Sequence, residues 1–313
     1  MRRPILALLG SVALAAAEAS AAAHGGQAGA LYQFGLGTQA FGFGGATLSL
    51  ARDPATILTN PAGAACIGRG VFVASHTLMA LGRSVNVVGF GMQSDPRAGF
   101  SVAWVNGGVG DVKGYDQNGN ATGTLKNGEN MFVMSFGTRF GAIMPGVSAK
   151  WLRTQLDDRS STAWAADLGV LVRLSRNLHV GIAMRNLEGH NTWTKTRNDG
   201  STTRLKEGLP TTLAAGASYC LRPMRLTVAT DYEYIDREGQ YLHFGATWTI
   251  LPALQLRAGY RWLGLRGASA HEGTPTAGAT LRTGIGGRRI NFDYAILSDP
   301  LGLVHSLGIR FEL

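Results

Sequence analysis

The sequence has few of the features that mark most soluble proteins and helical membrane proteins. Only two of its 313 residues are cysteine, ten are proline, and charged residues make up 16%, against a usual share of about 25%. No apolar run reaches the roughly 20 residues that a membrane-spanning helix needs. Ten prolines without a three-residue glycine repeat exclude collagen. An apolar content of 45% argues against a disordered chain.

Glycine is the residue that the chain has in excess. It occupies 44 of the 313 positions, about twice the average share of roughly 7%. Together with many short apolar stretches, this composition indicates an all-β protein. The formal net charge of +9 falls by one if residues 1–21 are removed, because they contain two arginines and one glutamate. A basic chain of this kind favours anionic surfaces or acidic cargo.

The first 21 residues have the pattern of a secretory signal peptide. Arg2 and Arg3 precede an apolar run over residues 5–17, and small residues allow cleavage after Ala21 or Ala23. The apolar run is too short for an anchor helix. We therefore expect an exported protein, and for an exported protein we expect no nucleic-acid partner.

Alternation of apolar and other residues predicts β-strands along most of the chain. In residues 303–313, for example, Leu307, Ile309 and Phe311 alternate with glycine, arginine and glutamate, as in a strand with two different faces. The same alternation predicts strands over residues 71–79, 84–93, 97–106, 128–140, 144–156, 162–174, 178–187, 210–220, 224–235, 240–250, 253–263, 275–285, 288–297 and 303–313. An even number of strands returns both ends of a bacterial barrel to the periplasm.

The lengths of the predicted connections divide them between two sides. The three longest, residues 107–127, 188–209 and 264–274, all fall on one side, and every connection on the other side is a tight turn. Outer-membrane barrels have short periplasmic turns and longer outer loops, whereas a sandwich has no reason to sort its loops. We therefore predict that residues 71–313 form an all-β, 14-stranded antiparallel transmembrane β-barrel in the bacterial outer membrane. Its expected partners include outer-membrane lipid, periplasmic chaperones and the barrel-assembly machinery.

Residues 22–70 do not fit the strand count and are rich in bends and caps. They contain a Gly-Gly bend, an Asp-Pro pair that can begin a helical turn, and an Asn-Pro pair that favours an extended residue before a turn. Such a compact segment suits a plug inside a barrel. The residues of this motif are Gly44, Gly45, Asp53, Pro54, Asn60, Pro61, Ala62 and Gly63.

The pattern G-x-G-G-A followed by D-P-A-x-x-x-x-N-P-A-G, within residues 41–64, resembles the N-terminal hatch of the FadL superfamily of outer-membrane proteins. This superfamily includes FadL-type transporters of hydrophobic compounds and PorV-type barrels of type IX secretion. The resemblance implies a hatch in the lumen and passive transport of small hydrophobic solutes. A PorV-like barrel that docks a secreted protein is the alternative. Residues 107–127 are nearly free of the large apolar residues that would form a FadL-type ligand groove, which argues against long-chain fatty acids.

Charged residues on the predicted inward faces are candidate functional residues, because charges in a lumen must pair, meet water or hold a plug. One interpretation is a salt-bridged interior that stiffens the barrel. A more specific interpretation is that Arg257, Arg261 and Asp231 clamp the hatch around Asp53 and Asn60. The lumen charges that we select are Asp231, Glu233, Arg257, Arg261, Asp293 and Arg310.

Signals for catalysis or metal binding are weak. The sequence contains no G-x-S-x-G, P-loop or C-x-x-C motif, and its histidines lack metal-ligand spacing. Asp116, Asn118 and Asn120 resemble the start of a calcium loop that lacks its later glycine and glutamate. We therefore expect no enzymatic activity, no catalytic residue, no metal site and no cofactor. Cys66 and Cys220 can form a disulfide in an oxidising compartment or remain two separate thiols.

Overall fold

The computed structural model describes residues 37–50, 53–110, 112–125, 127–196, 202–266, 273–299 and 301–313. The signal peptide expected over residues 1–21 and the first part of the expected hatch, residues 22–36, lie outside the described residues. Within the described parts of the chain, no helix has the length and hydropathy needed to cross a membrane.

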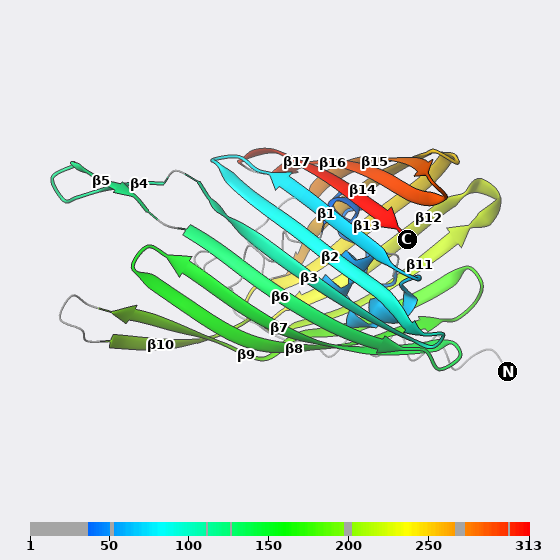
Figure 1. Ribbon diagram of the computed structural model, residues 1–313, viewed down its shortest axis with the longest axis horizontal. Helices are drawn as coiled ribbons and strands as arrows, with labels where there is room; N and C mark the ends of the chain where they lie inside the picture. Colours follow the sequence, from blue (N-terminus) through cyan, green and yellow to red (C-terminus); the bar gives the residue numbers. More distant parts are fainter. Residues whose placement is uncertain are drawn as a thin grey trace.

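The described strands form a closed barrel whose neighbours all run antiparallel (Figure 1). The barrel strands are β1 (Val71–Leu78), β2 (Arg83–Asp95), β3 (Ala98–Val109), β6 (Asn127–Thr138), β7 (Ile143–Leu156), β8 (Arg159–Arg173), β9 (Leu178–Thr196), β11 (Thr212–Leu221), β12 (Leu226–Ile235), β13 (Gly239–Leu251), β14 (Leu254–Arg266), β15 (Thr274–Ile285), β16 (Arg288–Asp299) and β17 (Gly302–Glu312). The first and last strands close the barrel, with Val71 opposite Glu312 and Leu78 opposite His305. The predicted 14-stranded antiparallel barrel is confirmed.

Two stretches expected to be loops contain strands. Within residues 107–127, β4 (Lys113–Tyr115) and β5 (Ala121–Thr124) pair as a hairpin. Strand β9 continues well beyond the expected end at residue 187 and pairs with β10 (Thr202–Gly208). The stretch after residue 190 alternates threonine with other residues, and β-branched side chains favour extended structure. These two outer connections therefore contain paired strand segments that were not predicted.

The barrel ends differ in the length of their connections. Tight turns join β2 to β3, β6 to β7, β13 to β14 and β15 to β16, and the barrel's first strand begins and its last strand ends at this same end. The long connections, which carry the β4–β5 and β9–β10 hairpins, project from the opposite end (Figure 1). In outer-membrane barrels the short turns are periplasmic. We refer to the two ends as the periplasmic end and the outer end.

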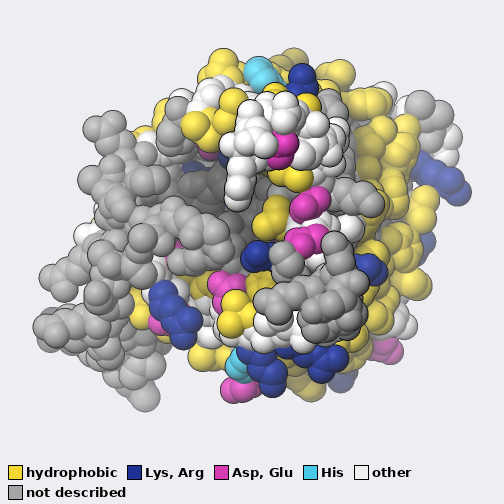
Figure 2. Space-filling view, turned by 90° about the vertical axis from the view of Figure 1, so that its left-hand side faces the viewer, with side chains coloured by type: hydrophobic (Ala, Val, Ile, Leu, Met, Phe, Trp, Pro, Cys, Tyr) yellow, Lys and Arg dark blue, Asp and Glu magenta, His cyan; other side chains and the backbone are white. Residues whose placement is uncertain are grey.

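The outward faces of the strands are apolar. Leu168 and Ile182 are about half exposed on β8 and β9, and apolar side chains cover much of the wall in Figure 2. An aromatic row crosses four neighbouring strands on this face, with centroid separations of 6.2, 5.5 and 6.5 Å. This row consists of Trp104, Phe132, Trp151 and Trp164. Aromatic girdles of this kind lie at membrane–water interfaces.

The position of the aromatic row predicts the cost of a charge on the wall. Leu168 lies four residues after Trp164 on β8, and its outward-facing side chain is 49% exposed. We expect Leu168→Arg to lower the free energy of unfolding in lipid vesicles by about 2–4 kcal/mol, as for a cation near the bilayer midplane. The control is Tyr115→Arg on the β4–β5 hairpin, which should change it by less than about 0.5 kcal/mol. Equal effects of the two variants in urea titrations would contradict the assignment of this wall to lipid.

Candidate functional site

The barrel lumen is occupied by the chain itself. We call residues 37–50 and 53–70 the inner segment. It contains the helix α2 (Thr38–Gly42) and the 3-10 helices η3 (Pro54–Leu58) and η4 (Pro61–Cys66). Helix η4 contacts β3, β6, β7 and β8, whereas α2 contacts β14 to β17 on the other side. Figure 1 shows these helices in blue, enclosed by the strands. The inner segment therefore bridges opposite walls of the barrel.

Two Asx-Pro pairs shape the inner segment. The Asp53 side chain accepts a hydrogen bond from the Ala55 amide at 2.8 Å and caps η3, with Pro54 at the first helical position. Asn60 is extended, with φ −145° and ψ 112°, and its Oδ1 accepts from the Ala62 amide at 3.1 Å. These are the roles that such pairs have at helix starts. Local sequence alone thus determines where η3 and η4 begin.

The inner segment lies directly on the backbone of the wall, at positions where the wall has glycine. A Cβ built on Gly169 would overlap Asn60 Oδ1, and one on Gly181 would overlap the Leu48 carbonyl oxygen. A Cβ on Gly146 would lie 2.5 Å from the Ala62 nitrogen. No side chain fits at these three positions while the inner segment keeps its place. The excess of glycine noted in the sequence therefore has a structural reason at the lumen surface.

The backbone of a single residue, Leu48, is held at both its N–H and its carbonyl group. Its N–H donates to Asp231 Oδ2 on β12 at 2.8 Å, and its carbonyl accepts from Asn60 Nδ2 at 3.0 Å. The same Asn60 amide lies 3.5 Å from the carbonyl oxygens of Val170 and Ile182 on β8 and β9. Both side chains are almost completely buried. Hydrogen bonds to a buried carboxylate are among the stronger ones in proteins, so this contact fixes the middle of the inner segment.

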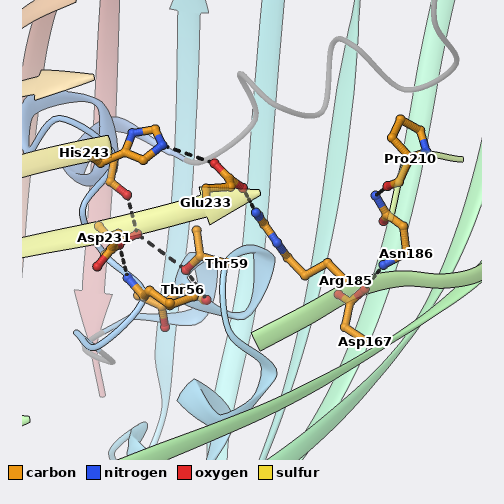
Figure 3. A network of polar contacts seen from close by, with 12 residues as sticks. Thr56, Thr59, Asp167, Arg185, Asn186, Pro210, Asp231, Glu233 and His243 are labelled. Atoms are coloured by element: carbon orange, nitrogen blue, oxygen red, sulfur yellow. Dashed lines mark hydrogen bonds and ion pairs between the residues drawn. The ribbon is translucent and has the colours of Figure 1, made fainter. Parts of the chain in front are cut away.

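A chain of charged groups continues from Asp231 along the inner face (Figure 3). Glu233 on β12 forms an ion pair with Arg185 on β9 and lies 3.2 Å from His243 Nε2. The other ring nitrogen of His243, Nδ1, donates to the Gly44 carbonyl at 3.2 Å. The bend at Gly44 is thus connected to the wall through an imidazole and a carboxylate.

A second cluster of charged side chains lies where the register between β8 and β9 shifts. Lys150 Nζ is 2.8 Å from Asp167 Oδ2, and Asp167 Oδ1 accepts from the Asn186 amide at 2.9 Å. Asn186 has a positive φ of 59° and donates from its side chain to the Pro210 carbonyl at 3.0 Å. Register shifts in this strand pair produce the bulge. Lys150 was not among the residues selected from the sequence, although the alternation in residues 144–156 places it inward. No periodicity predicts the bulge at Asn186.

The opposite wall pairs its charges in a third cluster. Arg257 Nη2 is 3.2 Å from Asp293 Oδ1, and Gln39 of α2 donates to Asp293 Oδ2 at 3.1 Å. Arg310 Nη1 lies 3.8 Å from Asp53 Oδ2. Burial raises the pKa of the Asp53 carboxyl above its ordinary value, and the charge of Arg310 opposes this effect.

The charged side chains selected from the sequence lie inside the barrel, in an arrangement that differs from the expected clamp. Asp53 lies beside Arg310 and not beside Asp231, and Asn60 contacts carbonyl groups. Arg261 contacts the inner segment through Phe41, whose ring centroid is 5.2 Å from the guanidinium carbon. Spacing in the sequence gives no information on which strand of a closed barrel faces which part of the inner segment.

A cavity of about 80 Å³ lies between part of the inner segment and residues of β13, β14, β15 and β17. Its apolar lining comes from Ala40, Phe43, Leu50 and Ala55, and its polar lining includes Arg282 and Arg310. The same two arginines also line an open vestibule of about 860 Å³ at the periplasmic end. The cavity and the vestibule therefore adjoin each other at these two side chains.

The remaining sequence motifs form no further site in the described residues. Asp116 accepts hydrogen bonds from Asn118 and Asn120 within one turn, and the Asn120 side chain holds the pKa of Asp116 below its ordinary value. Within the described ranges, no three metal-ligating side chains cluster together. Cys66 and Cys220 are both free thiols.

A closed barrel with an apolar outer wall and every barrel strand paired on both sides is a transmembrane barrel of the bacterial outer membrane. No family model and no curated protein matches the sequence. Among solved structures, the chain is similar to the CymD monoaromatic hydrocarbon channel, with a TM-score of 0.60 and 12% identity over 88% of this chain and 96% of that one.

Two further structures show the same fold. The Pseudomonas putida toluene transporter TodX matches with a TM-score of 0.60 and 14% identity, over 88% of this chain and 96% of that one. A Pseudomonas aeruginosa FadL homologue matches with a TM-score of 0.56 and 10% identity over the same shares, 88% and 96%. The expected FadL-type fold is thereby confirmed.

The glycine contacts predict a selective effect on the inner segment. We expect Gly181→Val to force Leu48 away from the wall, because a side chain at this position overlaps its carbonyl. The variant should lose about 1–3 kcal/mol of stability, as overpacked sites do, and should show a larger conductance in planar bilayers. Gly128→Val is the control, since no heavy atom lies within 4 Å of a Cβ at Gly128. Identical conductance of the two variants would show that the inner segment does not depend on this contact.

Proposed function

We propose that this protein is a passive outer-membrane channel for small hydrophobic solutes and that residues 22–70 act as its hatch. The observation that carries the proposal is the cavity beside the inner segment. Four apolar side chains line one part of it, and it adjoins the periplasmic vestibule at Arg282 and Arg310. A solute in this cavity lies next to the open vestibule at the periplasmic end.

The size of the cavity favours small solutes. About 80 Å³ is smaller than the roughly 150 Å³ of an apolar cavity that holds benzene, so an extended acyl chain does not fit and a small apolar molecule needs the cavity to widen. The fold supports the same class, because the similar structures include proteins described as a monoaromatic hydrocarbon channel and a toluene transporter. Transport is passive in this proposal, as the resemblance of residues 41–64 to the FadL superfamily implies.

The hatch needs only a local change to let a solute pass. Phe43 and Leu50 line the cavity and lie on either side of Leu48 in the sequence, whose backbone N–H and carbonyl group are bound by Asp231 and Asn60. Residues on either side of this fixed point can shift while the fixed point remains attached to β12. A movement of α2 away from β15 to β17 would enlarge the cavity without unfolding η3 or η4.

Docking of a secreted protein has less support. A docking surface at the outer end needs a contiguous apolar patch of several hundred square ångströms. On the β9–β10 hairpin, Leu205 is 66% exposed opposite Trp193, whose indole donates to Glu207 at 3.1 Å. These two side chains on one hairpin form only a small patch. Docking of a secreted protein is therefore kept as one of the results that the uptake experiment below distinguishes.

Filling the cavity tests the proposal. We expect Leu50→Trp to lower the initial uptake of labelled toluene by cells carrying the barrel about tenfold, which corresponds to about 1.4 kcal/mol on the barrier. The larger side chain occupies the space that the solute needs. Leu205→Trp on the outer hairpin is the matched control and should leave uptake unchanged. Heat-modifiable migration in gels checks that both variants are folded. Uptake at the wild-type rate by Leu50→Trp, or binding of a secreted protein without any uptake, would refute the channel.

A further inference from the structure

The cavity beside the inner segment has two chemically different sides. The inner segment supplies an apolar side, which consists of Ala40, Phe43, Leu50 and Ala55. The wall supplies one arginine each from β14, β15 and β17, namely Arg257, Arg282 and Arg310. An uncharged solute needs only the apolar side, and a buried cation costs free energy unless an anion or acceptor lies near it. The arginine side is therefore suited to an anionic group.

The spaces that adjoin the cavity continue its positive lining. The vestibule of about 860 Å³ at the periplasmic end shares Arg282 and Arg310 with the cavity and is also lined by Arg289. A second open pocket, of about 350 Å³, borders the cavity as well and is lined by Arg222 and Arg225 of the turn between β11 and β12. Arginines thus line the whole way from the cavity to the periplasm.

Carboxylates are fewer than arginines along this path. Among the described residues, six arginines line these three spaces, whereas the carboxylates that line them are Asp53 and Glu312. Both contact Arg310, with Nη1 at 3.8 Å from Asp53 Oδ2 and Nε at 3.6 Å from Glu312 Oε1. These separations exceed hydrogen-bond distances, and the buried Arg310 Nε has no hydrogen-bond acceptor in the described part of the chain. Arg310 therefore retains capacity for a further anion.

The outer end has a different charge pattern. Its short turns carry both signs, with Arg159 beside Asp158 at 3.8 Å and Arg237 beside Asp236 at 3.4 Å. Figure 2, which views this end, shows acidic and basic side chains near each other. The positive lining of the periplasmic spaces is therefore more than a reflection of the basic composition of the chain.

We propose that the channel admits small monocarboxylates with an apolar body, such as aromatic carboxylates, and that Arg282 and Arg310 bind the carboxylate where the cavity meets the vestibule. Guanidinium and carboxylate groups have matching geometry. The apolar body lies against Phe43 and Leu50 once the cavity widens, and the carboxylate faces the vestibule. The other arginines then attract the anion toward the periplasm. This inference rests on the proposed channel and names the class of its solute.

Uptake of three compounds that share one aromatic ring tests the proposal on the full chain. Cells that carry the barrel and lack other porins are given labelled benzoate, benzylamine or toluene at neutral pH, where benzoate is an anion and benzylamine a cation. Uptake by cells without the barrel is subtracted. We expect the initial uptake of benzoate to exceed that of benzylamine at least about tenfold, as electrostatic focusing in a charged cleft does. Equal uptake, or faster uptake of benzylamine, would overturn the proposal.

A substitution at the junction tests the site itself. Arg282→Gln removes the charge and keeps a polar side chain, and it should lower the ratio of benzoate to toluene uptake about tenfold, the effect of losing one hydrogen bond between charged groups. Arg282→Lys keeps the charge and should keep most of the ratio. Arg237→Gln in a turn of the outer end is the matched control and should leave the ratio unchanged. An unchanged ratio in Arg282→Gln would overturn the assignment of the site.

The three compounds also separate this inference from the proposed channel. Entry of toluene without entry of benzoate would overturn carboxylate binding and leave the channel for uncharged solutes in place. Entry of neither compound would contradict both. Heat-modifiable migration in gels checks that each variant is folded.

Discussion

The fit of the inner segment against the wall is the constraint on which the rest of the structure depends. A barrel of fourteen strands encloses more space than its own side chains fill, and here the backbone of residues 37–50 and 53–70 takes that space. Backbone can lie against backbone only where the wall has no Cβ, as at Gly146, Gly169 and Gly181. Every polar group of the inserted backbone then needs a partner, and Asp231 and Asn60 supply the partners for the N–H and the carbonyl group of Leu48.

The charges of the lumen follow from the same constraint. A buried carboxylate such as Asp231 costs free energy unless it is hydrogen-bonded, and the inner segment provides the hydrogen bond. Elsewhere the wall pairs its own charges, as Arg185 does with Glu233 and Arg257 with Asp293. The network therefore attaches the inner segment and also stiffens the wall. Between these attachments a small cavity remains open next to the periplasmic vestibule, and this is the feature on which the proposed channel rests.

Much of the architecture could be predicted from period-two alternation and from the sorting of connection lengths, because both follow directly from a wall between lipid and lumen. Asp53 and Asn60 could be placed as caps, since capping depends on neighbours in sequence. The partners of Asp53 could not be predicted, because Arg310 reaches it only after the barrel has closed. The bulge at Asn186 could not be predicted either, because a local register shift interrupts the alternation from which strands are predicted.

The claim that the inner segment is held in the lumen is tested most directly by the protection of the Leu48 backbone N–H from exchange. Hydrogen–deuterium exchange of the folded barrel should show strong protection of the Leu48 amide, which donates to Asp231 at 2.8 Å. In Asp231→Ala, protection of this amide should fall at least about tenfold, in line with the roughly 1.5–3 kcal/mol of a hydrogen bond to a charged group. The amides of β12 should keep their protection. Equal protection of Leu48 in both proteins would contradict the claim that this contact holds the inner segment in the lumen.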